Sequence, residues 1–447
     1  MSTIENTFSD IKSLAKKNNV EVELLITGNE RLRLGYQQRK LDKYEATQSQ
    51  IAGFRVLNGP SCGYSYAENL SDESLKRAFS EALTNSQTIK KEGVSIDLPK
   101  PSVSKDMSHL YQPESVAVEK KHEVARELEA RALERDARVT HVPYSGFIEE
   151  ESWFRVMNSQ GLDQQFKRTY YSGYSYPLAK QGEKSKCDGE SFFVTKFADV
   201  DVAGTVDTAV DKVLKLLSAQ QLKTGNYPVV LDKEIVGTFL QMLTDYFSAK
   251  SVEKGSSLLA GKLGQKIAST KFSLVDDPFD EHCTGTRPFD SEGSPSVVTP
   301  LFENGVFKNF LTNVEYAKKM NLPLTASASR SPTSTMGIGV SNLIIQKGQD
   351  SLLSMFKKAD EMIYLTNIDG GLDAGFKEAT GDFSLPAQGY LVKNGEIVGS
   401  VDQFVVSGNV LDLIAKIEGV GDTYNKSGSA ERAPDLFISE LSFAGCN

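Results

Sequence analysis

Side chains that bind soft metals are scarce in this chain of 447 residues, which contains four cysteines and four histidines. The scarcity of histidine restricts the zinc chemistry that the chain could carry by itself. The cysteines are scattered and form no CxxC pair, a pattern that suits a reducing cytoplasm better than a disulfide framework. They are Cys62, Cys187, Cys283 and Cys446.

Long apolar runs and clusters of basic residues are also missing. No segment approaches the run of about 18 apolar residues that a membrane span requires, and residues 1–17 lack the apolar core of a secretory signal. The net charge is −9, whereas binding of nucleic acid relies on clustered Lys and Arg that neutralise phosphates. We therefore expect a cytoplasmic protein without nucleic acid or a membrane as a direct partner.

The length of the chain predicts two or three domains. Residues 92–115 contain three prolines and little periodicity, which is typical of a linker. The stretch 223–228, KTGNYP, is a second turn-rich boundary. These boundaries predict an N-terminal α/β domain at 1–91, a central α+β domain at 116–222 and a C-terminal domain at 223–447.

Hydrophobic periodicity predicts the elements within these domains. Two Asn-Gly dipeptides between alternating apolar residues predict β-hairpins with type I′ turns at 301–311 and 390–401. Ser71 is a candidate N-cap for a helix that follows it. Because strands come in antiparallel runs with helices interspersed, the predicted class is α+β. The predicted helices span 3–18, 72–84, 120–136, 203–220, 233–247, 313–320, 351–358 and 408–416, with strands at 20–26, 31–36 and 52–58 and a further hairpin at 154–166.

The pair His122-Glu123 lies on the predicted helix at 120–136 and resembles the start of a zinc-peptidase motif. Such a motif needs a second histidine one turn later on the same face of the helix. Arg126 occupies that position and cannot bind zinc. Charged residues recur around most of the helix, so the sequence favours a solvated helix face over a metal site.

A second candidate is the loop at 276–293, DDPFDEHCTGTRPFDSEG, which concentrates nitrogen, sulfur and oxygen donors. These could bind a metal ion. However, the histidine and the cysteine are adjacent and no further His or Cys is nearby, so an ordered loop with Asx turns and ion pairs is favoured. The donors are Asp277, His282, Cys283, Asp290 and Glu292.

The stretch 366–397 is dense in glycine but lacks both GxGxxG and the P-loop lysine. Its glycines let the backbone turn sharply or approach a ligand closely, and composition alone favours a loop between two strands. No G-x-S-x-G motif occurs, which argues against a serine hydrolase.

Several stretches of the C-terminal domain resemble the TldD/PmbA family, whose members were once labelled modulators of DNA gyrase and are linked to intracellular metallopeptidases. NSQGL at 158–162 and the N-terminal pattern extend the resemblance across nearly the whole chain. The stretches that carry it are 276–293, 301–322, 341–355, 380–397 and 405–423.

The family contains two kinds of subunit. TldD-like members carry HExxxH on a helix of the C-terminal domain, and a distant cysteine completes their zinc site. TldE-like members, also called PmbA, lack these ligands and pair with the former. The corresponding helix here is 233–247, where Leu240 and Asp245 stand near the positions of the zinc histidines. No cysteine follows 419–428 until Cys446. The chain is thus identified as a TldE/PmbA-type subunit.

This resemblance implies a chain with no catalytic residue, metal ligand or cofactor of its own. Zinc is expected in a TldD-like, HExxxH-bearing partner, and the substrates are expected to be unfolded peptides. A homodimer is the alternative assembly when the partner is absent. The expected lining of the substrate cavity comprises Asp369, Gly370, Gly371, Thr380, Gly381, Asp382 and Phe383.

Two other functions are compatible with the sequence. One is a non-enzymatic regulatory protein of the gyrase-modulator type, which the acidic charge would restrict to protein contacts. The other is an independent peptidase that uses an unconventional site made of Asp245, His282 and Glu292.

Overall fold

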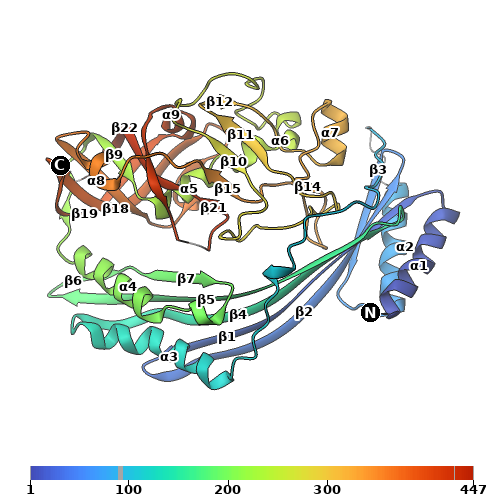
Figure 1. Cartoon of the computed structure of the whole chain (residues 1–447), viewed down its shortest axis with the longest axis horizontal. Coiled ribbons are helices and arrows are strands. Elements are labelled where there is room, and N and C mark those ends of the chain that lie inside the picture. Colours follow the sequence, from blue (N-terminus) through green and yellow to red (C-terminus); the bar gives the residue numbers. More distant parts are fainter. Residues whose placement is uncertain (1, 89–93, 427, 446–447) are drawn as a thin grey trace.

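A long curved sheet dominates the molecule, and the C-terminal unit lies over its concave side (Figure 1). The computed structural model describes residues 2–88, 94–426 and 428–445, so Cys446 lies outside the described residues. Within them the long sheet has seven strands in the order β3-β2-β1-β4-β5-β6, and β7 pairs with β5.

The N-terminal unit has the order helix, three strands, helix. Ser74 N donates a hydrogen bond to Ser71 Oγ at 3.3 Å, which confirms the predicted N-cap of the second helix. The runs predicted at 20–26 and 31–36 form one strand. Gly28 between them lies against the indole of Trp153, which a Cβ at this position would approach to 2.3 Å. The elements are α1 (Ser2–Lys17), β1 (Glu21–Gln37), β2 (Lys40–Asn58), β3 (Ser61–Ala67) and α2 (Asp72–Thr88).

The central unit continues the same sheet. β1 pairs antiparallel with β4 from Glu23↔Asn158 to Leu34↔Phe147, and the hairpin predicted at 154–166 is confirmed by the pairing of Met157 with Asp163. The first two units therefore share one sheet. The elements are α3 (Val118–Arg135), β4 (Val139–Asn158), β5 (Asp163–Gln181), β6 (Lys184–Cys187), β7 (Glu190–Val194) and α4 (Val202–Leu216).

The period-two alternation of β1 assigns the two faces of the sheet. Leu24 packs in a cluster with α1 and α2, and Leu34 packs in a cluster with α3 and α4. Leu25 points to the opposite face, where it packs against Phe289 of the C-terminal unit. The four helices thus cover one face, and the other face is left for the C-terminal unit.

The C-terminal unit combines an eight-stranded and a five-stranded sheet among the described residues. Most pairs are antiparallel, which confirms the α+β class, although β16 and β9 pair in parallel. Both Asn-Gly turns have positive φ at both central residues, as type I′ requires: Asn304 +48° and Gly305 +81°, Asn394 +50° and Gly395 +83°.

The strands of the two larger C-terminal sheets come from many parts of this unit, and β13 (Ala328–Ser329) pairs with β14 (Gly337–Ile338) in a small third sheet. The larger sheet contains β8 (Gln220–Gln221), β9 (Gly225–Leu231), β16 (Glu361–Ile368), β17 (Phe376–Lys377), β18 (Asp382–Lys393), β19 (Glu396–Asn409), β20 (Ile417–Tyr424) and β22 (Pro434–Ala444). The smaller one contains β10 (Leu274–Asp276), β11 (Thr299–Glu303), β12 (Val306–Phe307), β15 (Leu343–Ile345) and β21 (Glu431–Arg432).

The helix predicted at 233–247 is shorter in the structure. α5 (Lys233–Gln241) ends early, and a 3-10 turn at Thr244–Phe247 follows it. Leu240, Leu243 and Phe247 are all buried in the main core, and the change of helix type lets the chain bury apolar side chains from both segments. The other predicted helices are present as α7 (Val314–Met320), α8 (Leu352–Phe356) and α9 (Val410–Ala415).

Membrane-spanning helices were also sought in the structure. Over residues 2–88, 94–426 and 428–445, every helix is too short or too polar to cross a membrane.

Candidate functional site: a cleft between the long sheet and the C-terminal unit

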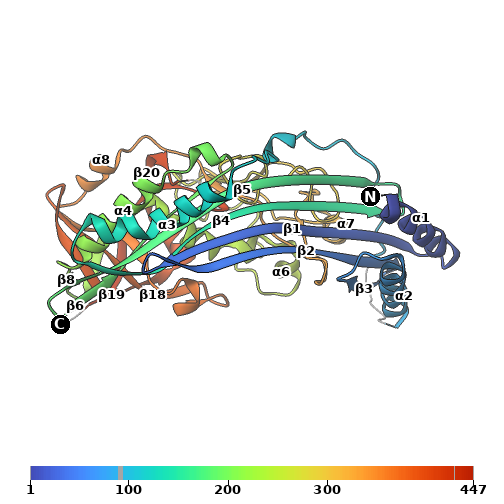
Figure 2. The ribbon, with the colours of Figure 1, turned by 90° about the horizontal axis from the view of Figure 1, so that it is seen from below.

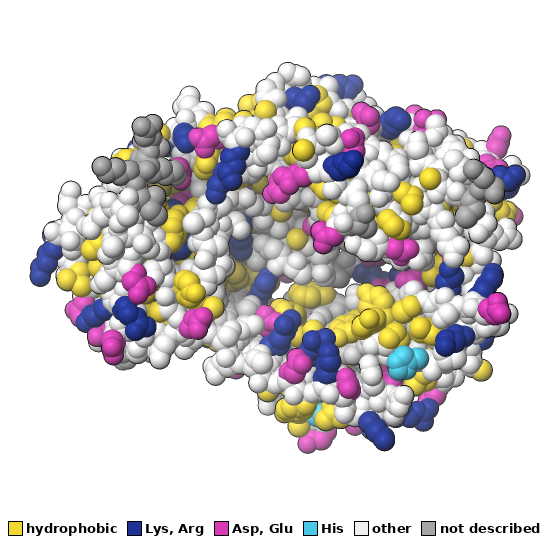
Figure 3. Space-filling view, turned by 180° about the vertical axis from the view of Figure 1, so that it is seen from behind, with side chains coloured by type: hydrophobic (Ala, Val, Ile, Leu, Met, Phe, Trp, Pro, Cys, Tyr) yellow, Lys and Arg dark blue, Asp and Glu magenta, His cyan; other side chains and the backbone are white. Residues whose placement is uncertain are grey.

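The C-terminal unit contacts the long sheet near both of its ends, and the space-filling view shows an opening between the two parts (Figure 3). At the end near α1 and α2, the join is a chain of buried ion pairs. Glu23 of β1 accepts from Arg55 of β2 at 2.7 Å and from Arg330 of the C-terminal unit at 2.8 Å, and Arg55 also binds Glu292 at 2.8 Å. These four side chains are at most 2% exposed, so we call them the buried clamp.

The second join lies near α4. β8 pairs in parallel with β19, and Lys186 of β6 forms an ion pair with Asp402 of β19. Glu190 of β7 binds Lys212 at 3.1 Å and Lys426 of the C-terminal unit at 3.4 Å. Ion pairs therefore hold the C-terminal unit to the long sheet at both ends of the opening.

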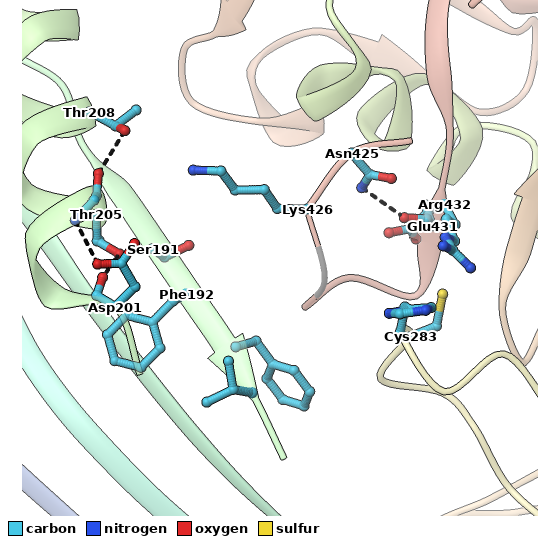
Figure 4. Close-up of a pocket in the computed structure, with 14 residues that line it drawn as sticks. Ser191, Phe192, Asp201, Thr205, Thr208, Cys283, Asn425, Lys426, Glu431 and Arg432 are labelled. Carbon is cyan, nitrogen blue, oxygen red and sulfur yellow. Dashed lines mark hydrogen bonds between the residues drawn. The ribbon is translucent and has the colours of Figure 1, made fainter. Parts of the chain in front are cut away.

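A cleft of about 560 Å³ lies beside the second join. One wall is the edge strand β7 with the start of α4, and its apolar side chains are Phe192, Phe193 and Val194. The opposite wall belongs to the C-terminal unit and is polar, as the close-up shows (Figure 4). Its side chains include Asn425, Lys426, Glu431 and Arg432.

Hydrogen bonds fix the polar wall. Asn425 donates from Nδ2 to the Glu431 carbonyl at 3.1 Å and accepts from the Ala433 N–H at 2.9 Å. The hydroxyl of Ser429 donates to the Glu431 carboxylate. Arg432 pairs with Asp280 and lies over the ring of Tyr424, 4.3 Å from its centroid. Because these groups are held before any ligand arrives, the wall is preorganised for binding.

The first turn of α5 supports this wall from behind. The Lys426 N–H donates to Glu234 Oε1 at 3.1 Å, and burial raises the pKa of Glu234. Leu240 is buried in the core, whereas Asp245 is exposed on the 3-10 turn. The two residues predicted near the zinc positions therefore do not face a common site.

The chemistry of the cleft is that of binding. Cys283 lines it, but burial raises the pKa of its thiol to about 12, which keeps it protonated at neutral pH. The amide of Asn425 and the ammonium of Lys426 can engage peptide carbonyls or carboxylates, and the phenylalanines opposite can accept apolar side chains.

The loop at 276–293 has the structure that the sequence favoured. Asp277 accepts from the Phe279 N–H at 2.9 Å and Asp290 from the Glu292 N–H at 3.0 Å, which are Asx turns. His282 lines the cleft, whereas Glu292 is fully buried and paired with Arg55. Together with the exposed Asp245, these residues form no shared site. Over the described ranges, no three His, Cys, Asp or Glu side chains are grouped to bind a metal ion.

His122 lies on α3 as predicted, and its role is structural. Its Nδ1 is 3.0 Å from the Tyr36 hydroxyl, and its ring stacks on Tyr44 with 5.9 Å between centroids. Glu123 is exposed. The expectation of a solvated face is thus wrong for His122, because the strands β1 and β2 supply aromatic partners that the local sequence does not reveal.

The residues predicted to line a substrate cavity lie in two groups, and neither lines the cleft. Asp369 accepts from Gln388 at 2.8 Å, next to the exposed Gly370 and Gly371. In the second group, Asn409 donates to the Thr380 carbonyl at 2.8 Å and to Asp382 at 2.9 Å. Gly381 and Phe383 are buried there, and Phe383 packs edge-on against Phe239.

Of the side chains that line the cleft, the sequence analysis singled out His282 and Cys283 but none of the others. The lining side chains come from 191–194, 201–208, 282–283, 425–426 and 431–432, which are distant along the chain. One local signal was available: the polar pairs Asn425-Lys426 and Glu431-Arg432 lie within ten residues after the 405–423 stretch that resembles the family.

Three family models match the chain in order along its length. They describe the PmbA/TldA metallopeptidase domain 1 at residues 22–86, the central domain at 111–217 and the C-terminal domain at 224–445. A metalloprotease PmbA homolog of Haemophilus influenzae is 23% identical, over 97% of this chain and 94% of its own length. A metalloprotease TldD homolog of Buchnera aphidicola is 25% identical, over 83% and 78%.

Solved structures agree in fold. A protein from Thermotoga maritima described as a "putative modulator of a DNA gyrase" superposes with a TM-score of 0.91 at 26% identity, covering 99% of this chain and 100% of that one. TldE from Thermococcus kodakarensis gives 0.86 at 22% identity, covering 98% and 100%. The family models cover most of the chain, and the chain therefore belongs to the PmbA/TldD metallopeptidase family.

Proposed function

We propose that this chain is the TldE/PmbA-type subunit of a cytoplasmic metallopeptidase complex that cleaves unfolded peptides. It binds no zinc itself, and a TldD-like partner with HExxxH carries the metal. The match to the PmbA homolog supports this, because it extends over 97% of the chain, compared with 83% for the TldD homolog. The observation that carries the proposal is a metallopeptidase fold whose α5 has no imidazole or thiol.

The donors present here do not fit a zinc site. A catalytic zinc needs about three protein ligands, usually including histidines that share one site. The four histidines lie on separate segments: His141 is in β4, His109 pairs with Glu281 at 2.9 Å, His122 contacts Tyr36, and His282 lines the cleft. We therefore derive no hydrolytic step on this chain.

Within the complex this chain would bind and orient the peptide. The opening and its cleft offer the polar wall for the peptide backbone and Phe192 and Phe193 for side chains. Holding an extended peptide in register lowers the entropic cost of attack by the partner's metal site, and enclosing it excludes bulk water. The segment 369–383 stays in this proposal as further lining, completed only when the partner is bound.

Purification from the native cytoplasm tests the division of roles. A tagged chain should recover a HExxxH-bearing relative, and the complex should contain zinc that is lost when the partner's histidines are replaced. Recovery of gyrase subunits without such a relative would contradict the proposal and favour the regulatory alternative. Neither nucleic acid nor membrane is expected in the complex.

Kinetics of the reconstituted complex test the cleft. Lys426→Ala removes one charged donor, and we expect KM for an unfolded peptide to rise about tenfold with kcat unchanged. Lys254→Ala is the matched control, because Lys254 is exposed but does not line the cleft. Equal KM values for the two variants would contradict a role of the cleft in peptide binding.

A further inference from the structure

Arg168 of β5 lies on the face of the long sheet that is turned toward the C-terminal unit. It stands opposite Ser152 of β4, which stands opposite Asn29 of β1, and Asn29 shares its face of β1 with Leu25. Figure 2 shows β5 along one border of the four long strands. Arg168 Nη1 donates to the carbonyl of Thr284, so the guanidinium reaches from the sheet to the C-terminal unit.

Arg168 also lies beside the cleft. Tyr170, the next residue on the same face of β5, stacks on Phe193 of the apolar wall with 4.9 Å between ring centroids. On the other side of the cleft, Thr284 directly follows Cys283, which lines it. Arg168 therefore stands next to the apolar wall and contacts the segment that carries part of the opposite wall.

Within residues 2–88, 94–426 and 428–445, Arg168 has no acidic partner. Its guanidinium donates only to neutral oxygens, which are the Thr284 carbonyl and, at 3.3 Å, the Ser152 hydroxyl. The nearby carboxylate of Glu150 is already paired with Arg31 at 3.0 Å. Burial lowers the pKa of Arg168, and the negative charge around it offsets this only in part.

Two other arginines with little exposure are paired with carboxylates. Arg330 binds Glu23 at 2.8 Å in the buried clamp. Arg155 binds Asp163, also at 2.8 Å. Removing a charge from water is unfavourable unless an opposite charge compensates it. Arg168 therefore lacks the compensation that these arginines have, and an anion from outside the chain could supply it.

The geometry of the guanidinium indicates which anion would bind. Arg168 Nη2 makes no hydrogen bond with the described part of the chain and is not one of its buried unpaired atoms, so it is open to solvent. A guanidinium presents N–H groups in a planar fork that matches a carboxylate, and such charge-assisted bonds are stronger than neutral ones. Carboxylates are the main anionic groups of an unmodified peptide at neutral pH.

We propose that Arg168 binds a carboxylate of the peptide substrate, which makes this subunit selective for peptides that place an acidic side chain or their C-terminus beside the cleft. The inference rests on the peptide-binding role proposed above. Arg168 is a binding residue and takes no part in hydrolysis.

Fluorescence anisotropy of labelled, unfolded peptides with the full chain tests this without cleavage. One peptide carries a single glutamate and a free C-terminus, and a second has amides in place of both carboxylates. The wild type should bind the first peptide about tenfold more tightly, and Arg168→Gln should bind both equally. Arg168→Lys keeps the charge without the fork and should show an intermediate preference. Arg126→Gln, at an exposed position of α3, is the matched control and should behave as the wild type.

Two further peptides with one carboxylate each identify its source. Tight binding of the glutamate peptide assigns an acidic side chain, and tight binding of the peptide with the free C-terminus assigns the terminal carboxylate. No binding or no preference by the wild type, or an equal loss of affinity for charged and uncharged peptides in Arg168→Gln, would overturn the proposal. A preference for carboxylates without cleavage by the reconstituted complex would contradict only the peptidase role.

Discussion

The two halves of β2 have opposite surroundings. From Ala52 to Leu57 the strand is buried between α1, α2 and the C-terminal unit, whereas every residue from Lys40 to Gln50 is exposed. The buried half carries Arg55 of the buried clamp, and the exposed half carries Lys40 and Lys43 without a covering element. Both halves pair with β1, with a register shift at Asp42 in the exposed half, so strand formation does not require burial here. The buried half is where the long sheet is fixed to the C-terminal unit, and the exposed half is where the sheet can bind a partner.

The largest expected effect comes from breaking the buried clamp. Arg55→Met should lower the free energy of unfolding by about 3–5 kcal/mol, because it leaves the carboxylate of Glu292 buried without its cation. Chemical denaturation monitored by tryptophan fluorescence measures the loss. A change below about 1 kcal/mol would show that the clamp is not what fixes the sheet to the C-terminal unit.

A second substitution tests how closely β2 approaches the C-terminal unit near the buried clamp. A Cβ at Gly53 would lie 2.2 Å from the carbonyl oxygen of Pro332 in the C-terminal unit. Gly53→Ala should therefore cost about 1–3 kcal/mol through forced displacement of backbone. The control is Ser49→Ala in the exposed half, and thermal melting should separate the two. Similar melting temperatures for Gly53→Ala and Ser49→Ala would mean that the C-terminal unit separates easily from the long sheet.

The third prediction concerns a buried carboxyl outside the clamp. Burial raises the pKa of Asp435 from 3.8 to about 6, and the Lys233 N–H donates to it at 2.9 Å. The folded state thus binds its proton more tightly than the unfolded state. Its stabilising contribution is complete below pH 3.8 and is lost as the pH rises through 6.

Asp435→Asn keeps the acceptor oxygen and removes the titration. The variant should lose less stability than the wild type between pH 4 and 6. Denaturation midpoints measured across this pH range compare the wild type with Asp435→Asn. Asp42→Asn in the exposed half of β2 is the control. Identical slopes for wild type and Asp435→Asn would contradict the assignment.

The smallest effect on stability is expected in the exposed half of β2, from Lys40 to Gln50. Lys40→Met should change the free energy of unfolding by less than about 0.5 kcal/mol, because the side chain is exposed. The measurement is made on dilute protein, so that association adds nothing. A loss comparable with that of Arg55→Met would show that the exposed half is covered in solution.

Local signals in the sequence predicted local structure well. The Asn304-Gly305 and Asn394-Gly395 turns were correct because positive φ at two successive residues strongly favours these residue types. The prediction of Ser71 as an N-cap was also correct, because its hydroxyl accepts a hydrogen bond from Ser74, only three residues further along the chain. The class and the family followed from such local patterns.

Features that depend on packing were not predictable from local patterns. The continuous sheet requires Glu23 to meet Asn158, and nothing near either residue specifies that partner. The end of α5 at Gln241 depends on the core around Leu243 and Phe247. The cleft is made of segments that only the fold brings together, so the sequence analysis placed the cavity lining at 369–383 instead.

Elemental analysis of the purified chain tests the central claim, that it is a zinc-free member of a metallopeptidase family. The chain produced alone in zinc-supplemented medium should contain no stoichiometric zinc and should not cleave an unfolded peptide. One zinc ion bound per chain, together with peptide cleavage by the chain alone, would contradict it.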